Sequence, residues 1–318
     1  MENLVLSVII ISYNTREMTL ECLRTLYSDL GTLPAEVWIV DNASQDGSVE
    51  AIRSAYPQVR LIANERNLGF GAANNQAMRE ACGKYFLLLN SDAFPKAGAI
   101  GKLVEYLDTH PEVGLVGPRL LNGDGSLQIS CFRFPSPGLT WKNHLWISSL
   151  QRRLRRNAGA TETPVEGLAD GYYLSGACAL VRSETDRKVD GFDEAFFLYS
   201  EEADWQKRIL AAGWTLAYVS EAEVVHLHGQ SGNRDRLKYT ILAYEGKDLF
   251  IWKHYGLFGL ILCSIPKVIS FAVGTLIHLP RLGALMRRDF ERSFALQASA
   301  TMLVRQFTCW GALKHRRV

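Results

Sequence analysis

Three carboxylates, Glu201, Glu202 and Asp204, lie within four residues of one another, directly after the aromatic stretch 196–199. Crowding raises the pKa of at least one such carboxyl group, because each negative charge opposes ionisation of its neighbours. A carboxylate with a raised pKa can serve as a general base near neutral pH. The dipole at the start of a helix would also favour acidic residues, but it does not explain why an apolar stretch leads into them.

Asp92 and His226 are candidates for holding a divalent ion, Mg²⁺ or Mn²⁺. Asp92 follows the apolar strand expected at 85–90, beside Asn90, and an oxygen ligand in that place leaves room for substrate phosphates. Strand alternation puts His226 and His228 on one face, and the neutral imidazole of His226 would complete the metal shell. The alternatives are a strand-terminating turn at Asp92 and a structural role for the histidine.

Asp41 closes the strand expected at 36–41 and begins the polar stretch 41–48. A carboxylate at the carboxyl end of a strand can accept hydrogen bonds from a base or a ribose. The alternative is a polar turn that caps the next helix, since Asp, Asn, Ser and Gly all favour such positions.

Gly69, Gly71 and Asn74 form a Gly-x-Gly-x-x-Asn sequence. This is close to a dinucleotide fingerprint, and Asp92 lies about where that motif needs its acid, so an NAD(P)-dependent dehydrogenase with the dinucleotide at 69–74 is a competing interpretation. The turn follows the third expected strand, however, and residues 64–66 separate it from that strand. A loop that needs small residues for tight helix docking would explain the glycines equally well.

The elements that must position these residues alternate along the first half of the chain. Strands are expected at 5–12, 36–41, 59–63 and 85–90, and helices at 16–30, 47–56, 71–81 and 97–110. Such a series predicts an α/β fold with a mostly parallel, doubly wound sheet, in which ligands bind outside the carboxyl ends of the strands. The second half is less regular, with strands expected at 168–181, 215–219 and 223–226 and a helix at 204–212.

The composition excludes several classes of protein. The chain has 318 residues, of which 47% are hydrophobic and 21% charged, with a net charge of +2. These values exclude a disordered chain, a collagen-like fibre and a polytopic membrane protein, and they give no general electrostatic case for nucleic-acid binding. The six cysteines are scattered and the N-terminal apolar run is too short for a signal peptide, so we expect a cytoplasmic protein.

Residues 256–279 form an apolar stretch long enough to cross a bilayer. Lys267 falls at its centre, and a central lysine costs about 2.5–3.5 kcal/mol on insertion scales. We therefore expect helices that lie in the membrane interface, with Arg281, Arg287, Arg288 and Arg292 near anionic headgroups. Helices buried in a soluble core or in a homodimer interface are the alternative.

Taken together, these motifs resemble the family 2 inverting glycosyltransferases, particularly the rhamnosyltransferase-like members. The matching pieces, in the family's order, are 8–14, 41–48, 67–75, 87–92, 191–193 with 196–205, and 226–231. The resemblance implies a GT-A fold with a Rossmann-like sheet. It implies a glycosyltransferase domain at 1–232, divided into a nucleotide-sugar half at 1–121 and an acceptor half at 122–232, followed by a C-terminal helical region at 233–318.

The resemblance also implies roles for individual residues. Glu202 would be the catalytic base, Asp92 and His226 the metal ligands, and Asp41 the contact to the nucleotide base. The remaining substrate-binding residues would be Asn67, Asn74, Asn90, Glu201 and Asp204. Two positions depart from the family pattern: Asn90 replaces the first acid of the Asp-x-Asp motif, which should weaken metal binding, and Glu202 stands where Asp is commoner.

The implied reaction is metal-assisted displacement, in which a sugar such as rhamnose moves from a nucleoside-diphosphate sugar to a saccharide or lipid-linked acceptor in surface-polysaccharide synthesis. Lipid-linked acceptors fit peripheral attachment at the inner face of the cytoplasmic membrane. A non-catalytic sugar-binding protein would keep the fold, but the intact acidic cluster argues against it. A processive synthase is disfavoured because no Gln-x-x-Arg-Trp sequence occurs.

Overall fold

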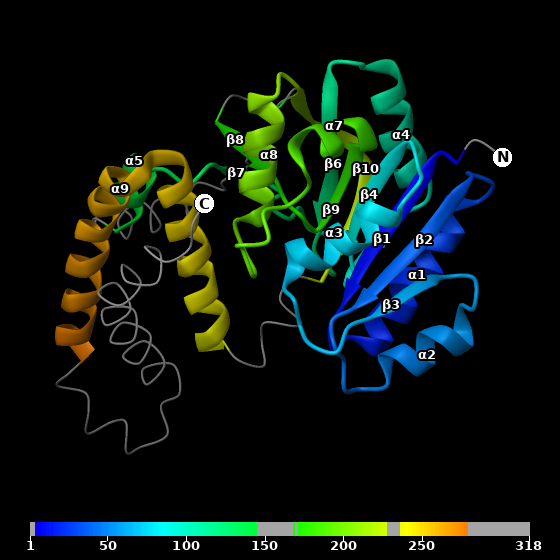
Figure 1. Ribbon diagram of the computed structural model, residues 1–318, viewed down its shortest axis with the longest axis horizontal. Helices are drawn as coiled ribbons and strands as arrows, with labels where there is room; N and C mark the ends of the chain where they lie inside the picture. Colours follow the sequence, from blue (N-terminus) through cyan, green and yellow to red (C-terminus); the bar gives the residue numbers. More distant parts are fainter. Residues whose placement is uncertain (1–3, 145–167, 169–170, 228–235, 279–318) are drawn as a thin grey trace. The chain divides into compact units, whose positions relative to one another are not determined.

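The computed structural model describes residues 4–144, 168, 171–227 and 236–278 (Figure 1). The chain forms two compact units. The first comprises residues 1–134 and 162–234, and the second comprises residues 135–161 and 235–318. The division of the first unit into a nucleotide-sugar half and an acceptor half stays a prediction.

The first part of the chain alternates between strands and helices, as predicted. The elements are β1 (Leu6–Ser12), α1 (Arg16–Leu30), β2 (Ala35–Asp41), α2 (Ser48–Ala55), β3 (Arg60–Ala63), α3 (Phe70–Glu80), β4 (Tyr85–Asn90) and α4 (Ala99–Thr109). Strands β1, β2, β3 and β4 are parallel to one another. Nearly every residue of β1 and β4 is buried, which is why their sequences are continuous apolar runs without polar alternation.

The main sheet has eight strands in the order β3-β2-β1-β4-β9-β6-β10-β5. The strands not yet named are β5 (Ala93–Pro95), β6 (Val113–Leu121), β9 (Cys178–Arg182) and β10 (Thr215–His226). Strand β9 is antiparallel to both β4 and β6, β10 is parallel to β6, and β5 is antiparallel to β10. The α/β class and the central sheet are therefore confirmed, with antiparallel strands in its second half.

Strand β6 was not predicted, although it lies near the middle of the sheet. Gly114, Gly117 and Pro118 interrupt its apolar pattern. A Cβ atom on Gly114 would lie 2.8 Å from the Trp214 side chain, and one on Gly117 would lie 3.3 Å from Leu174. Glycine is needed at both positions because neighbouring side chains leave too little room for a Cβ atom. The local sequence does not show this requirement.

Two further strand predictions differ from the structure. The stretch expected as one strand at 168–181 is β8 (Tyr172–Leu174) and β9, joined by a turn at 175–177. Strand β8 pairs with β7 (Cys131–Arg133) in a separate two-stranded sheet. The strands expected at 215–219 and 223–226 are one strand, β10, with a register shift against β6 between Val219 and Glu223.

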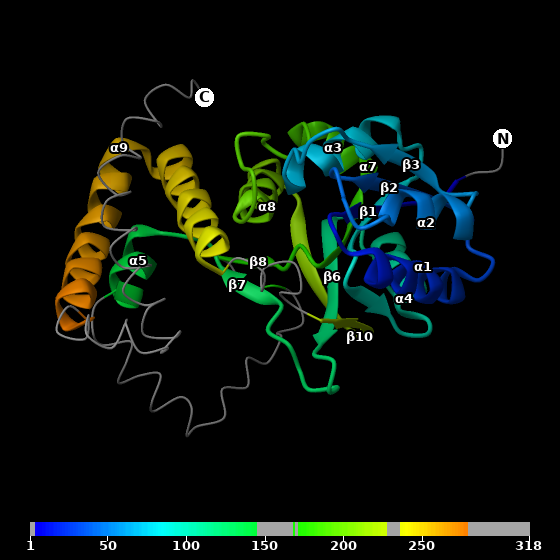
Figure 2. The same ribbon diagram turned by 90° about the horizontal axis from the view of Figure 1, so that it is seen from below.

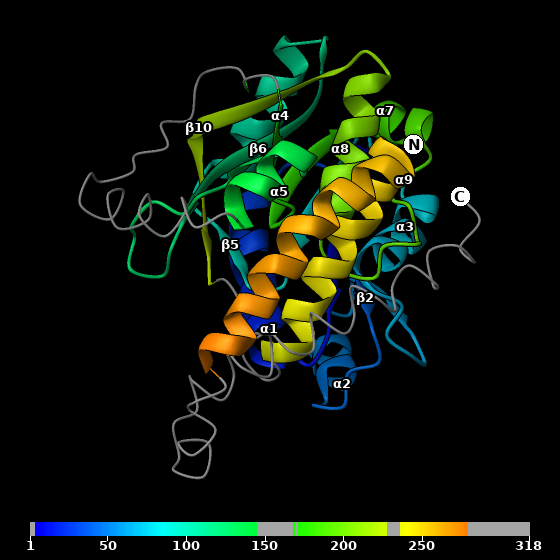
Figure 3. The same cartoon turned by 90° about the vertical axis from the view of Figure 1, so that its left-hand side faces the viewer.

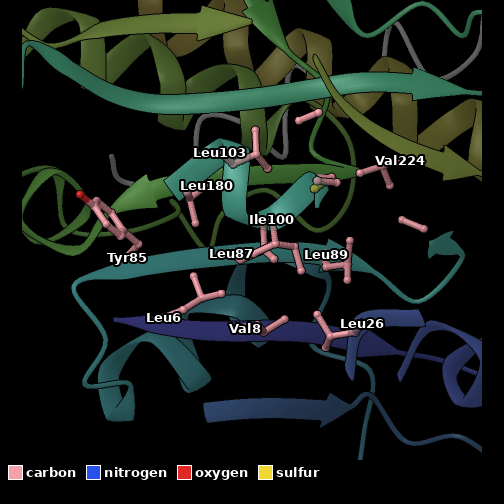
Figure 4. Close-up of a cluster of buried hydrophobic side chains, with 14 of the residues drawn as sticks. Leu6, Val8, Leu26, Tyr85, Leu87, Leu89, Ile100, Leu103, Leu180 and Val224 are labelled. Carbon is pink, nitrogen blue, oxygen red and sulfur yellow. The ribbon is translucent and has the colours of Figure 1, made fainter. Parts of the chain in front are cut away.

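Helices cover both faces of the main sheet (Figure 2). Helices α1 and α4 bury Leu23, Leu26 and Leu103 against one face (Figure 4). Helices α3, α7 (Ser183–Val189) and α8 (Glu201–Ala211) lie on the opposite side. There Met78 and Trp205 join a second apolar cluster. This layering leaves the carboxyl ends of β1, β2 and β4 at one edge, where the polar residues of the sequence motifs lie.

The second unit contains α5 (Pro137–His144) and α9 (Arg236–His278) (Figure 3). Gly256 has φ 65° and ψ −168°, which breaks α9 into two helices. Lys267 on the second helix pairs with Asp248 on the first, so the two run alongside each other as a hairpin. The helical character predicted for 233–318 is seen in the described part, and residues 279–318, including the four arginines, lie outside it.

Candidate active site

Asp41 lies at the carboxyl edge of the sheet, where its side chain is buried. It is buried at the end of β2, opposite Ser12 of β1. Its Oδ1 accepts a hydrogen bond of 2.8 Å from the Ser44 backbone N–H. Its Oδ2 has no hydrogen-bond partner among the described residues. A buried carboxylate oxygen without a donor is costly, so this position suits a ligand that brings an N–H or O–H group.

Asn42, which was not predicted as a site residue, connects this edge to the loop before α3. Its Nδ2 donates to the Gly69 carbonyl oxygen at 3.1 Å, and its Oδ1 accepts from Asn64 Nδ2 at 3.1 Å. Its backbone N–H donates to the Ser12 carbonyl oxygen at the end of β1. The ends of β1 and β2 and the loop that carries Gly69 are therefore held together.

The two glycines of the Gly-x-Gly sequence serve close packing. Gly69 has φ +89°, and a Cβ atom there would lie 2.3 Å from the Phe197 carbonyl oxygen. The neighbouring Phe70 backbone N–H donates to that same oxygen at 2.9 Å. A Cβ atom on Gly71 would lie 2.9 Å from the Phe192 side chain. The sequence left two interpretations open, a dinucleotide cradle and a loop for tight helix docking. The structure supports the second, tight docking of α3.

Asn67 and Asn74 are placed at the two sides of this docked turn. Asn67 Oδ1 accepts from the Gly69 backbone N–H at 2.9 Å, which shapes the turn. Asn74 is buried in α3, where its Nδ2 donates to the Phe70 carbonyl oxygen at 2.9 Å. The Asn74 Oδ1 atom has no hydrogen-bond partner among the described residues. Substrate binding by these two residues remains a prediction.

We expect Gly69→Ala to lower the free energy of unfolding by about 1–3 kcal/mol and to reduce kcat more than it changes KM. The backbone angle strains any residue other than glycine, and the new Cβ atom would push the segment that carries Phe197 away from α3. Urea unfolding and steady-state kinetics measure the two effects. Gly213→Ala is the matched control, because Gly213 has φ +93° but no atom of the described residues within 4 Å of the added Cβ. Equal kinetic losses in both variants would contradict the packing role.

Asn75 anchors the segment that leads into the acidic cluster. Its Nδ2 donates to the Phe192 carbonyl oxygen at 2.8 Å, and its Oδ1 accepts from the Phe192 backbone N–H at 2.9 Å. The two residues are 117 positions apart, so no local signal in the sequence could have revealed this contact. The backbone then adopts left-handed conformations at Tyr199 (φ 69°) and Ser200 (φ 70°), immediately before α8. Such strain occurs where the surrounding structure holds a backbone in one required geometry.

Glu202 faces the turn between β8 and β9. Four residues further along α8 and on the same face, Gln206 accepts from the Leu174 backbone N–H and donates to the Leu174 carbonyl oxygen, each at 2.8 Å. A Cβ atom on Gly176 would lie 3.4 Å from Glu202 Cβ. The next residue, Ala177, accepts a hydrogen bond of 2.9 Å from the Asn90 backbone N–H at the end of β4. This short path places Glu202 beside the sheet edge.

The pKa values of Glu201 and Tyr173 are both raised by burial and by the negative charge of Glu202. Burial, followed by the charge of Glu202, raises the pKa of Glu201 well above its ordinary value. Burial, followed by the charges of Glu202 and Glu201, likewise raises the pKa of Tyr173. The carboxyl group of Glu201 therefore holds its proton more tightly than an ordinary glutamate does.

Asp204 lies in a different environment from Glu202. It is fully buried, and its Oδ2 accepts from Arg208 Nε at 2.9 Å. Arg208 also donates to the backbone carbonyl oxygens of Val189 and Gly191, the latter at 2.7 Å. The ion pair thereby ties α8 to the turn after α7. Asp204 has a structural role here, and its predicted contact with substrate stays a prediction.

Asp92 and His226 are brought together, as the sequence predicted. His226 Nε2 lies 3.3 Å from Asp92 Oδ1, and both side chains are almost fully buried. The Leu227 backbone N–H donates to the Asp92 carbonyl oxygen at 3.0 Å, and His226 pairs with Ala93 across β10 and β5. His226 Nδ1 makes a 2.7 Å hydrogen bond to Gln128 Oε1, a residue that was not predicted. His228 lies outside the described residues.

The donor atoms of Asp92 and His226 fit a divalent ion. The described residues contain no group of three or more His, Cys, Asp or Glu side chains arranged for a metal. Magnesium and manganese at diphosphate sites need only one or two protein ligands, because phosphate oxygens and water fill the remaining positions. Asn90 precedes this pair at the end of β4. Asp41 lies on β2, separated from β4 by β1, so a ligand reaching from Asp41 to Asp92 must cross the end of β1.

Comparison with known proteins agrees with this geometry. Residues 7–169 match the family model described as glycosyl transferase family 2. The chain is 31% identical over 239 residues to N-acetylglucosaminyl-diphospho-decaprenol L-rhamnosyltransferase of Mycobacterium tuberculosis, covering 69% of this chain and 75% of that protein. It is 24% identical over 294 residues to the glycosyltransferase AglE of Haloferax volcanii, covering 90% and 85%.

Solved structures support the fold. The mannosyltransferase PcManGT from Pyrobaculum calidifontis, in complex with GDP-Man and Mn²⁺, has a TM-score of 0.54 at 19% identity, covering 95% of this chain and 86% of that one. TarS 1–349 from S. aureus in complex with UDP has a TM-score of 0.53 at 16% identity, covering 92% and 80%. The chain therefore belongs to glycosyl transferase family 2, as its motifs predicted, and is a glycosyltransferase with the GT-A fold.

Proposed function

We propose that this glycosyltransferase moves rhamnose from a nucleoside-diphosphate sugar, dTDP-rhamnose first among the donors, to a lipid-linked saccharide acceptor, with inversion at the anomeric carbon. The similarity to the mycobacterial rhamnosyltransferase supports this donor and acceptor class. The observation that carries the reaction type is the separation of two sets of acids: Asp92 lies with His226, whereas Glu202 lies at the turn 175–177. One set suits the diphosphate and the other suits the acceptor.

The donor would bind along the sheet edge. Asp41 Oδ2, which is buried, would accept a hydrogen bond from the nucleotide base. Asn67, Asn74 and Asn90 would contact the remainder of the donor. Asp92 and His226 would hold Mg²⁺ or Mn²⁺, which supplies positive charge to the leaving diphosphate. A metal of this kind is present in the PcManGT structure.

Glu202 would act as the general base in the transfer step. Its carboxylate would remove the proton from an acceptor hydroxyl, whose oxygen forms a bond to the anomeric carbon from the face opposite the diphosphate. The bond from that carbon to the diphosphate oxygen breaks, and the diphosphate leaves with the electron pair. Glu201, whose pKa is raised by burial and by the charge of Glu202, would lie beside the base, and Asp204 would hold α8 through Arg208.

Screening nucleoside-diphosphate sugars for metal-dependent turnover tests this proposal most directly. We expect dTDP-rhamnose to be consumed in the presence of Mn²⁺ and a polyprenyl-diphosphate saccharide, and the configuration at the anomeric carbon of the product to be inverted. If the enzyme consumes a UDP-hexose and does not consume dTDP-rhamnose, the rhamnose assignment is rejected. Retention of configuration would reject the role given to Glu202.

The second helix of α9 supports attachment to a membrane surface. Phe258, Ile265 and Ile269 are exposed, with Phe258 at 72%, and their spacing places them along one stripe of the helix. The lysine that argued against membrane contact lies on the other side, where Lys267 is 3% exposed and paired with Asp248. By length and composition, 237–273 could also cross a bilayer. We favour a helix lying in the interface at the inner face of the cytoplasmic membrane.

We expect the double variant Phe258→Asp with Ile269→Asp to bind lipid vesicles about 100-fold more weakly, because two apolar side chains no longer enter the acyl region. Vesicle flotation at low and high salt measures the change. Leu210→Asp, on the solvent side of α8, is the matched control. A wild-type protein that never floats would reject membrane attachment, and a dimer that the same double variant breaks would assign the stripe to a homodimer interface instead.

A further inference from the structure

Gln128 lies just after a tight turn that follows β6. The Asn122 backbone N–H donates to the Ser126 carbonyl oxygen at 2.8 Å, and Asp124 Oδ1 accepts from the Ser126 backbone N–H at 3.0 Å. The chain then returns along the end of β6, and the Gln128 backbone N–H donates to the Leu120 carbonyl oxygen at 2.9 Å. The backbone of Gln128 is therefore anchored to a central strand of the sheet.

The orientation of the Gln128 side-chain amide is determined by two acceptors. Its Nε2 donates to Asn122 Oδ1 at 2.9 Å and to the His226 backbone carbonyl oxygen at 3.0 Å. Asn122 is itself oriented, because its Nδ2 donates to Ser126 Oγ at 2.9 Å. With both N–H bonds of Gln128 directed in this way, the Oε1 atom is the end of the amide that faces the imidazole of His226.

Because Oε1 can only accept a hydrogen bond, His226 Nδ1 must carry the proton in the 2.7 Å contact between them. In the neutral imidazole, Nε2 then has a lone pair and no proton. This nitrogen lies 3.3 Å from Asp92 Oδ1. Two atoms that can both donate an electron pair thus face the same small region, which is the arrangement a cation requires.

We propose that Gln128 is a positioning residue, which holds the His226 ring in the Nδ1–H tautomer so that Nε2 and Asp92 together face the divalent ion. The proposal deepens the proposed metal-assisted transfer and rests on it for its biological purpose. Without Oε1, the ring can carry its proton on Nε2 and donate to Asp92, and that hydrogen bond would occupy the position of the ion. Ligating histidines are commonly oriented through their other nitrogen in this way.

The first test reads the tautomer without metal or substrate. ¹⁵N NMR of histidine side chains, at a pH where the ring is neutral, distinguishes Nδ1–H from Nε2–H. We expect the wild type and Gln128→Glu to show Nδ1–H at His226, because both keep an acceptor oxygen. We expect Gln128→Leu to shift toward Nε2–H. Gln58→Leu, at an exposed glutamine before β3, controls for the loss of an amide.

The second test measures metal binding directly. Titration with Mn²⁺, followed by the EPR signal of the free ion, should show about 10–100-fold weaker binding in Gln128→Leu than in the wild type. Gln128→Glu should recover most of the affinity, and Gln58→Leu should match the wild type. Thermal unfolding of each variant checks that the fold is retained. If Gln128→Leu does not fold, the tautomer of His226 in Gln128→Glu is the deciding measurement. An Nε2–H tautomer of His226 in that variant would overturn the proposal.

The proposal is wrong if Gln128→Leu keeps the Nδ1–H tautomer and binds Mn²⁺ as tightly as the wild type. Its failure is distinguishable from failure of the proposed function. A tautomer shift together with weakened Mn²⁺ binding would support the role of Gln128 even if no donor sugar were transferred. Conversely, full rhamnosyl transfer with an unchanged tautomer in Gln128→Leu would retain the function and reject the positioning role.

Discussion

Replacing Glu202 by Gln is expected to lower kcat for sugar transfer by about 10²–10⁴-fold, the usual contribution of a general base. The amide matches the carboxylate in size, so it keeps the packing against Gly176, but it cannot accept the proton of the acceptor hydroxyl. Donor binding should change little, because Asp41, Asp92 and His226 are retained. Steady-state transfer assays and calorimetric titration with the nucleoside diphosphate measure the two properties.

Glu201→Gln is the matched control for this variant. Burial and the charge of Glu202 raise the pKa of Glu201, so a glutamine imitates the neutral form that this environment favours. We expect a clearly smaller loss of kcat than in Glu202→Gln. The base would have to be reassigned if Glu202→Gln retained wild-type turnover, or if the loss were confined to Glu201→Gln.

Replacing Lys267 by Met is expected to destabilise the α5–α9 unit by about 3–5 kcal/mol, because it removes the cation that pairs with the buried Asp248 carboxylate. Both side chains of the pair are about 5% exposed or less. Burial and the charges of Lys267 and Lys247 lower the pKa of the nearby His144 to about 4, so that ring is neutral in the wild-type protein. Hydrogen exchange of the α9 amides, with urea unfolding, measures the loss.

The double variant Asp248→Leu with Lys267→Met removes both charges and should recover most of the lost stability. Replacing a buried ion pair by apolar residues of similar volume is often neutral or stabilising. A large loss in the double variant would mean that the pair itself, and not the avoidance of one uncompensated charge, stabilises the hairpin. Unchanged stability in Lys267→Met would show that the lysine is not buried in solution.

The first half of the fold was predictable because its signals are local. Strands β1 and β4 are buried on both faces, so each appears in the sequence as an uninterrupted apolar run, and β1 leads directly into the amphipathic helix α1. Strand β6 gave no such signal, because glycines interrupt its apolar run where the side chains of Trp214 and Leu174 leave no room for a Cβ atom. A glycine inside a strand often marks the close approach of a residue from elsewhere in the chain, which the local sequence does not reveal.

The candidate site was predictable to a different extent at each residue. Asp92 and His226 were paired correctly because both lie at the edges of recognisable strands. The contribution of Asn75 was missed because its partner, Phe192, lies 117 positions away. The sequence also grouped Asp204 with Glu202, although the structure gives Asp204 an arginine partner and places Glu202 at the turn between β8 and β9.

By itself, the sequence determined the class of this protein: the order of apolar runs specifies the α/β sheet, and the combination of motifs at the strand ends and at a helix start resembles the family 2 glycosyltransferases. Only the tertiary structure decided how those groups are used. Whether Lys267 is exposed or buried against Asp248, whether Gly69 packs against another segment, and which nitrogen of His226 faces Asp92 all depend on partners distant in the chain. Burial and hydrogen bonding act through space, and their geometry exists only once the chain has folded.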